Sequence, residues 1–181
     1  MPNAKIKYLL FSNYLSLFSF AFFNPLFAIY VVNKGMPAEQ VGFALGINLY
    51  IAALIILFIG KFEDKRKNKA KLIALGYVVL AIASCSYLFV HNFSGLVIAQ
   101  AINALGVGIY IPALRTTYGK SEDKGKETTE WAYMEGGGRF FMATGAVVGS
   151  LIFKFYGFKT MFILIALIQL VAAYVVARVP K

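Results

Sequence analysis

The stretch that decides the fold is VGFALGINLYIAALIILFIGKFEDKRKNKAK, residues 41–71. Its first part, residues 41–59, is apolar and carries no charged residue. A helix of about 20 such residues spans the hydrocarbon core of a bilayer. Its second part, from Gly60 onward, is rich in lysine. An apolar span that runs into a basic loop is typical of a membrane helix whose loop lies on the cytoplasmic side.

Similar apolar stretches recur along the whole chain, near residues 8–32, 41–59, 72–90, 95–114, 131–153 and 160–177. The first is long enough to tilt or kink, and Pro25 predicts a kink in it. Of the 181 residues, 60% are hydrophobic and 14% are charged, whereas soluble domains average about 45–50% and about 25%. The sequence therefore predicts an all-α integral membrane protein, with six transmembrane helices in a single bundle over residues 1–181.

The net charge of +10 comes mostly from short segments between the apolar stretches. Basic residues concentrate at the N-terminus, in 60–71, in the polar linker 115–130 and at the C-terminus. By the positive-inside rule, we expect both termini on the cytoplasmic side of the plasma (inner) membrane. Charges placed in this way form no patch on a soluble recognition fold, so the lipid bilayer is an expected partner and nucleic acid is not.

Residue types that carry catalysis or bind metals are sparse. Cys85 is the one cysteine and His91 the one histidine, and neither belongs to a ligand pattern. The sequence contains no phosphate-binding loop and no nucleophile paired with a base. We therefore expect no metal, no cofactor and no enzymatic activity.

The basic loop after the second apolar stretch carries a recognisable pattern. GKFEDKRKNKAK resembles the loop between the second and third helices of the major facilitator superfamily. Gly60 and Asp64 match its Gly-x-x-x-Asp pattern, and Lys65 and Lys69 take its basic positions. The sequence departs from the pattern at Lys67, where the family has glycine.

The fourth apolar stretch adds to the resemblance. QAINALGVGIYIPALR is similar to the family's fourth-helix pattern, Arg-x-x-Gln-Gly-x-Gly, with Gln100 in the arginine position, Asn103 in the glutamine position and Gly106 as the second glycine. In proton-driven members that arginine is tied to coupling, so its absence weakens a transfer of proton antiport to this chain. Gly145-Ala-Val-Val-Gly149 resembles the glycine-rich fifth helix of exporters, without its usual proline.

The resemblance implies half of a twelve-helix fold, in which two six-helix bundles flank a site near the bilayer midplane. We expect two copies to form this assembly as a homodimer, since an even number of spans inserts both copies the same way up. The alternative is the N-terminal half of a longer protein. Gly42 with Gly46, and Gly145 with Gly149, are small-x-x-x-small pairs expected at the interface between bundles; packing within one bundle is the alternative.

Polar residues inside the apolar stretches indicate a cavity or a packed interior, because they are costly in lipid. Asn13 and Asn24 fall nearly on one face of the first helix, and Asn48 lies in the second stretch. In the family the first and fourth helices line the central cavity. Asn13, Asn24, Asn103 and Tyr110 are therefore candidate substrate contacts; the alternative for each is an interhelical hydrogen bond without a ligand.

Glu135 and Arg139 are an acid and a base inside one apolar stretch. If the helix enters the membrane at Trp131, Arg139 lies about 12 Å deep at about 1.5 Å per residue. Three interpretations stay open. The two form a structural ion pair, within the helix or across a dimer; Glu135 is a proton-coupling carboxylate; or Arg139 binds an anionic substrate.

Together these features predict a secondary active transporter, an antiporter that moves a small solute by alternating access. The glycine-rich fifth helix favours export, driven by a proton gradient. The alternative is a non-transporting membrane subunit with an assembly or regulatory role, which the missing arginine at Gln100 favours.

Overall fold

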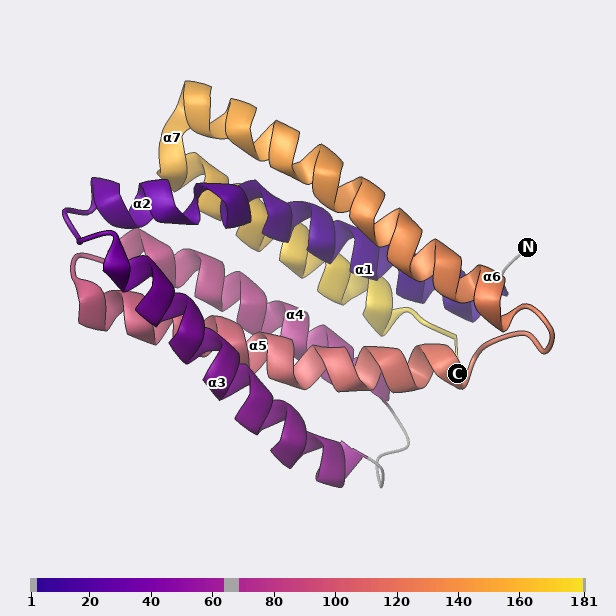
Figure 1. Ribbon diagram of the computed structural model, residues 1–181. Helices are drawn as coiled ribbons and strands as arrows, with labels where there is room; N and C mark the ends of the chain where they lie inside the picture. The colour runs from indigo at the N-terminus through magenta and orange to yellow at the C-terminus, as the bar shows by residue number, and fades with distance from the viewer. Residues whose placement is uncertain (1–2, 64–68, 181) are drawn as a thin grey trace.

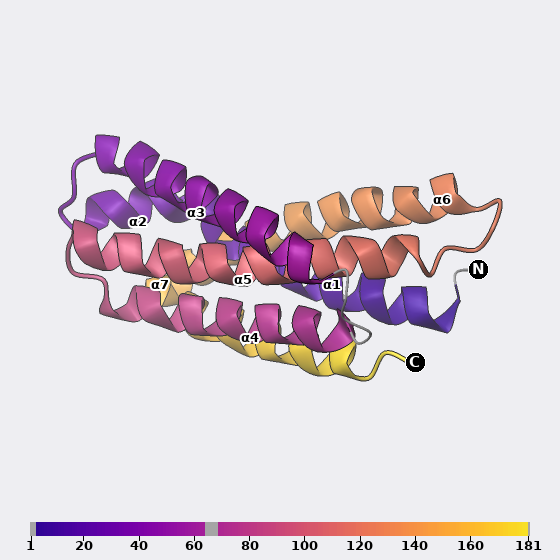
Figure 2. The same ribbon diagram turned by 90° about the horizontal axis from the view of Figure 1, so that it is seen from below.

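All regular structure in the computed structural model, which describes residues 3–63 and 69–180, is helical. The long helices lie lengthwise beside one another, and both ends of the chain lie at the same end of the bundle (Figures 1 and 2). The elements are α1 (Ala4–Phe23), a 3₁₀ turn η1 (Asn24–Leu26), α2 (Phe27–Asn33), α3 (Glu39–Glu63), α4 (Lys69–Ser86), a 3₁₀ turn η2 (Tyr87–Phe89), α5 (Phe93–Gly119), α6 (Glu127–Ala132), the π-helical η3 (Tyr133–Gly137) and α7 (Gly138–Ala177).

Five helices among the described residues are long and apolar enough to cross a membrane: Ala4–Asn33, Glu39–Lys61, Lys69–Phe89, Phe93–Gly119 and Glu127–Ala177. The last contains both the fifth and the sixth apolar stretches. It bends at Gly157, whose φ of 72° and ψ of −177° are not helical, and its two halves run in opposite directions from there (Figure 1). The fifth and sixth apolar stretches are therefore joined by a turn at one glycine, within a single continuous helical element.

Helices in the structure also begin and end at residues that differ from the bounds of the apolar stretches. η1 begins at Asn24 and contains Pro25, so the kink expected in the first stretch is present; proline lacks the N–H that an unbroken helix needs. The predicted linker 115–130 is helical at both ends, where α5 continues to Gly119 and α6 begins at Glu127. Arg115 therefore lies on α5 and not in a loop. Hydropathy did not predict this, because it marks the apolar part of a helix and not the residue at which the helix ends.

The first half of α7 packs closely against α1 through two glycines. A Cβ atom added to Gly145 would collide with the carbonyl oxygen of Phe18, and one added to Gly149 would collide with the backbone of Phe22. Small residues let membrane helices approach backbone to backbone in this way. Both glycines thus make their close contact within the bundle. This is the alternative to the contact between bundles that the sequence suggested.

α3 is the least covered of the long helices. Only 11% of its most apolar 18 residues are buried, compared with 44–50% in the other four spans. A Cβ atom added to Gly42 or Gly46 would meet nothing within 4 Å. Leu49, Leu54 and Leu57 are each about two-thirds exposed (69%, 67% and 69%). One face of α3 is therefore uncovered within this chain.

Two apolar clusters fill the bundle. One, around Tyr77, lies towards the chain ends, and the other, around Phe162, lies at the opposite end. Between them, the buried side-chain amide of Gln169 on α7 donates to the carbonyl oxygen of Ser16 (3.3 Å) and to the hydroxyl of Ser19 (3.1 Å) on α1. These bonds tie the second half of α7 to α1 and satisfy polar groups that lipid could not.

Candidate functional site

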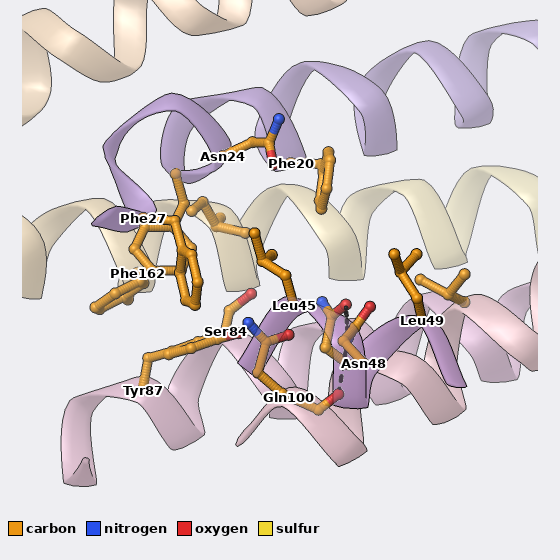
Figure 3. Close-up of a pocket in the computed structure, with 14 residues that line it drawn as sticks. Phe20, Asn24, Phe27, Leu45, Asn48, Leu49, Ser84, Tyr87, Gln100 and Phe162 are labelled. Atoms are coloured by element: carbon orange, nitrogen blue, oxygen red, sulfur yellow. Dashed lines mark hydrogen bonds between the residues drawn. The ribbon is translucent and has the colours of Figure 1, made fainter. Parts of the chain in front are cut away.

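A cavity of about 230 Å³ gathers four side-chain amides from three parts of the chain. Asn24 comes from η1, Asn48 from α3, and Gln100 and Asn103 from α5. We call it the amide cavity. Figure 3 shows Asn24 across the cavity from Asn48 and Gln100. No charged side chain is among the described residues that line it; the others are Phe20, Phe23, Phe27, Leu45, Leu49, Ser84, Tyr87, Val107, Phe162 and Ile165.

One of these amides joins α3 to α5. The side-chain nitrogen of Asn48 donates to the backbone oxygen of Gln100 (2.9 Å) and to the side-chain oxygen of Asn103 (3.2 Å), as the dashed line to Gln100 shows in Figure 3. Gln100 is buried and Asn103 half-buried, whereas Asn24 is exposed on the opposite wall. An apolar cavity with a few neutral donors and acceptors suits a small solute that is largely apolar and carries hydrogen-bonding groups.

A second cavity, of about 250 Å³, contains charged residues. Arg115 from α5, Glu135 from η3 and Arg139 from α7 line it, together with Asn13 from α1 and Tyr110 from α5. We call it the charged cavity. Two guanidinium groups and one carboxylate make it a place where an anion or a transferable proton would be held. Leu17, Ile111, Leu114, Met134, Gly138 and Met142 complete the lining.

Glu135 and Arg139 share this cavity without forming an ion pair with each other in the part of the chain that the structure describes, and both side chains are exposed. The backbone gives the physical reason. Residues 133–137 form a π-helix, whose wider i→i+5 turn moves residues four apart out of the alignment that an α-helix gives them. The ion pair within the helix, one of the three interpretations, is therefore not formed in this structure.

The predicted substrate contacts fall into two groups. Asn24 and Asn103 line the amide cavity, whereas Asn13, Tyr110 and Arg139 line the charged cavity. Asn13 and Asn24 are separated by about 16 Å along the helix axis at about 1.5 Å per residue. α1 and the turn η1 that follows it thus contribute to both cavities at different depths, and α5 also lines both.

Three glycine and lysine positions of the two sequence patterns lie outside both cavities. Gly106 is buried where α5 packs against α4, and a Cβ atom there would lie 2.8 Å from a leucine side chain of α4. Gly60 lies near the end of α3, and Lys69 begins α4. Asp64 and Lys65 lie outside the described residues.

Three features of the site were not predicted. Asn48 carried a signal, since it is an amide inside an apolar stretch. Arg115 was counted with the loop because it directly follows the fourth stretch. Tyr87 and Phe162, whose rings stack at 5.3 Å with an interplanar angle of 16°, form one wall of the amide cavity. Nothing in the sequence distinguishes these two rings from the many others.

Comparison with known proteins gives a consistent picture. The sequence profile of the Major Facilitator Superfamily matches residues 9–181. The chain is 26% identical over 167 residues to the multi-drug resistance efflux pump PmrA of Streptococcus pneumoniae, covering 90% of this chain and 41% of the pump. It is 24% identical over 152 residues to the methyl viologen resistance protein SmvA of Salmonella typhimurium (81% and 30%) and 20% identical over 132 residues to the quinolone resistance protein NorA of Staphylococcus aureus (73% and 34%).

The fold resembles that of the POT family transporter PepTSo, seen in its in meso crystal structure, with a TM-score of 0.70 at 18% identity, covering 96% of this chain and 36% of that one. The chain spans less than half the length of each of these proteins. The profile match and the membrane-spanning helices confirm the expectation of a multi-pass membrane protein of this family. With its profile match running from residue 9 to the last residue, this chain belongs to the Major Facilitator Superfamily.

Proposed function

We propose that this chain is a six-helix half of a secondary active transporter, which moves a small solute across the membrane by alternating access. The observation that carries the proposal is the convergence of Asn24, Asn48, Gln100 and Asn103 on one cavity between membrane-spanning helices. Side-chain amides within membrane-spanning helices are expensive unless they serve packing or a ligand. Only Asn48 donates a side-chain hydrogen bond to another member of this group.

The sixth pass is supported by the reversal at Gly157, which divides α7 into two antiparallel halves. Six passes place both termini on one side, and the basic segments put that side in the cytoplasm of a plasma membrane. Alternating access needs a second bundle to close the cavity from the other side. The uncovered face of α3, with Gly42 and Gly46 open for close approach, is where that bundle would dock.

We propose a second copy of this chain as that bundle, related by a twofold axis along the membrane normal. The resulting homodimer has twelve helices, and its two amide cavities face each other near the midplane. This arrangement is supported by the open face of α3 and by the similarity to a fold built from two such halves.

The two cavities then have different roles, one in solute binding and the other in proton coupling. The amide cavity holds the solute, with Asn24 and Asn103 as the principal hydrogen-bonding contacts. In the charged cavity, Glu135 carries the coupling proton, and Arg139 and Arg115 line the same cavity. Asn13 and Tyr110 are polar neighbours of these charges.

Export is the direction that the relatives favour. An efflux pump and two resistance proteins are among the proteins that the chain resembles. Gly145 and Gly149, which also suggested an exporter, give α7 its close contact with α1. We therefore propose proton-coupled antiport of a small solute out of the cell.

Transport in reconstituted vesicles tests the function. Wild-type protein and an Asn103→Leu variant are compared for uptake of a quinolone and of methyl viologen, with and without an imposed pH gradient. Uptake by the wild type that requires the gradient and is lost in the variant supports the proposal. Equal flux in both proteins, or none beyond that of empty vesicles, contradicts it.

Cross-linking tests the second copy. With Cys85 replaced by serine, Gly46→Cys is expected to cross-link two chains in lipid, whereas a thiol at the exposed Leu167 of α7 is not. Native mass spectrometry then gives the number of chains per particle. A monomer that still transports would overturn the homodimer.

A second candidate is a membrane subunit that does not transport. Gln100 occupies the position of the family's arginine, and its buried side chain carries no charge. Such a subunit would co-purify with a partner and show no flux in vesicles, alone or with that partner. Flux that depends on Asn103 would exclude it.

A further inference from the structure

A third cavity opens at the end of the bundle opposite the chain termini. It has a volume of about 730 Å³ and lies between the end of α2, η2 and the start of the second half of α7. We call it the outer cavity. Its lining residues are Tyr30, Asn33, Lys34, Tyr87, Leu88, Phe89, Phe158, Lys159 and Phe162. Neither the transport cycle nor the sequence patterns use it.

The outer cavity is electropositive at its rim. Lys34 and Lys159 line it from two separate segments, with the amide of Asn33 beside Lys34. No acidic side chain is among the described residues of the lining. The ammonium of Lys34 lies 5.7 Å from the centre of the Tyr30 ring, a cation–π distance. This contact directs one positive charge towards the cavity instead of into bulk solvent.

The wall of the outer cavity is aromatic and well ordered by mutual contacts. Phe158 and Phe162 stack at 6.0 Å with an angle of 19°, and Tyr87 stacks on Phe162 at 5.3 Å. The Tyr30 hydroxyl donates to the backbone oxygen of Tyr87 at 2.6 Å, which fixes its ring in place. The cations at the rim suit the charged headgroup of a lipid at the membrane–water boundary, and the aromatic wall suits its apolar part.

We propose that the outer cavity binds the phosphate headgroup of an anionic phospholipid. The ammonium groups of Lys34 and Lys159 and the amide nitrogen of Asn33 donate to the phosphate oxygens. The glycerol and the first acyl carbons lie against Phe158 and Phe162. Its volume is within the range of small-molecule sites. An inorganic phosphate ion shares the charge of the headgroup but leaves the aromatic wall exposed to water, so the lipid is the better match.

The lysines must act as ligands here, and not only as side chains that reach the interface. Lys154 provides the matched control. It lies at the same end of the bundle on α7, is exposed, and stacks its ammonium over the Phe155 ring at 5.3 Å, yet it does not line the cavity. General attraction between lipid and basic residues would therefore involve Lys154 as much as Lys34.

Native mass spectrometry of the full chain in detergent, titrated with phosphatidylglycerol, phosphatidylcholine or inorganic phosphate, tests the proposal. The wild type is expected to bind one phosphatidylglycerol more tightly than any phosphatidylcholine, whose choline carries an opposing positive charge. The double variant Lys34→Gln/Lys159→Gln is expected to weaken that site about 30-fold, as the loss of two basic contacts implies. Lys34→Arg/Lys159→Arg retains the site, and Lys154→Gln leaves it unchanged. Circular dichroism establishes that each variant is folded.

Three results would overturn the proposal. The first is equal affinity for the two lipids. The second is an equal loss of affinity in Lys154→Gln, which would mean unspecific attraction. The third is bound inorganic phosphate that phosphatidylglycerol does not displace, which would identify a site for the free ion.

Discussion

The side-chain nitrogen of Asn48 on α3 lies 3.2 Å from the side-chain oxygen of Asn103 on α5. The pair joins the least covered helix of the bundle to a helix that lines both cavities. Its position at the edge of the amide cavity gives it two roles, in holding α3 and in setting the polarity of the cavity.

Replacing Asn48 by leucine separates these roles. A hydrogen bond between membrane helices contributes on average about 0.6 kcal/mol, so the variant is expected to fold with a small loss of thermal stability. Transport is expected to fall more than about tenfold, because leucine removes a polar group from the edge of the amide cavity. A tenfold fall requires a loss of only about 1.4 kcal/mol in the interaction with the solute. Vesicle uptake and thermal unfolding in detergent measure the two effects.

The matched control is Ser150→Ala on α7. It also removes a side-chain hydrogen bond, from Ser150 to the backbone oxygen of Ala146 at 2.8 Å, but lies outside both cavities. Full transport by Asn48→Leu would show that the cavity is not used by the solute.

Gly145→Val is expected to destabilise the bundle. Its side chain would meet the Phe18 backbone, which cannot move aside without separating α7 from α1. Overpacking of this kind costs about 1–3 kcal/mol. Thermal unfolding of the variant should show a lower midpoint, whereas Gly136→Val, where an added Cβ atom meets nothing within 4 Å, should leave the midpoint close to that of the wild type. Equal behaviour of the two variants would contradict the close packing of α1 and α7.

Gly157→Ala is expected to lower stability by a different route. At φ 72° an alanine is strained whatever the space around it, at a cost of about 1–3 kcal/mol. The suitable control is Gly136→Ala, where the φ is not positive and a Cβ atom meets nothing within 4 Å. A lower unfolding midpoint in the first variant alone supports the single-residue turn. An unchanged midpoint would mean that the chain reverses elsewhere.

Glu135→Gln is expected to remove the dependence of transport on the pH gradient, because an amide takes up no proton at this position. Downhill flux of the solute should continue, since the amide cavity is intact. Glu127→Gln serves as the control, as Glu127 is an exposed acid on α6 outside the charged cavity. The measurement is solute uptake into vesicles at several imposed gradients. A dependence on the gradient that survives in Glu135→Gln would assign coupling to another group.

The sequence predicted the features that depend on composition over a whole helix. The long apolar stretches predicted membrane-spanning helices, because hydropathy depends only on the residues of one stretch. Pro25 predicted the break between α1 and α2, because its missing N–H affects only the helix that contains it. The family resemblance was confirmed by the profile match.

Features that depend on contacts between helices were outside the reach of sequence reasoning. The division of the polar residues into two cavities follows from the depths of Asn13 and Asn24 and from which helices flank them. The π-helical turn that moves Glu135 out of line with Arg139 has no signature in the sequence beyond the glycines around it. The partner of Gly145 was equally hidden, because a small residue shows that something comes close but not which helix.

Tyr87 and Phe162 line both the amide cavity and the outer cavity, so the two sites share one stacked wall. Any ligand that favours one arrangement of these rings favours it for both sites. Thermodynamic reciprocity then fixes the size of the effect: the factor by which an occupant of the outer cavity changes the affinity of the amide cavity equals the factor in the reverse direction. A bilayer whose composition alters occupancy on one side of the wall would thereby tune, to the same extent, what is held on the other.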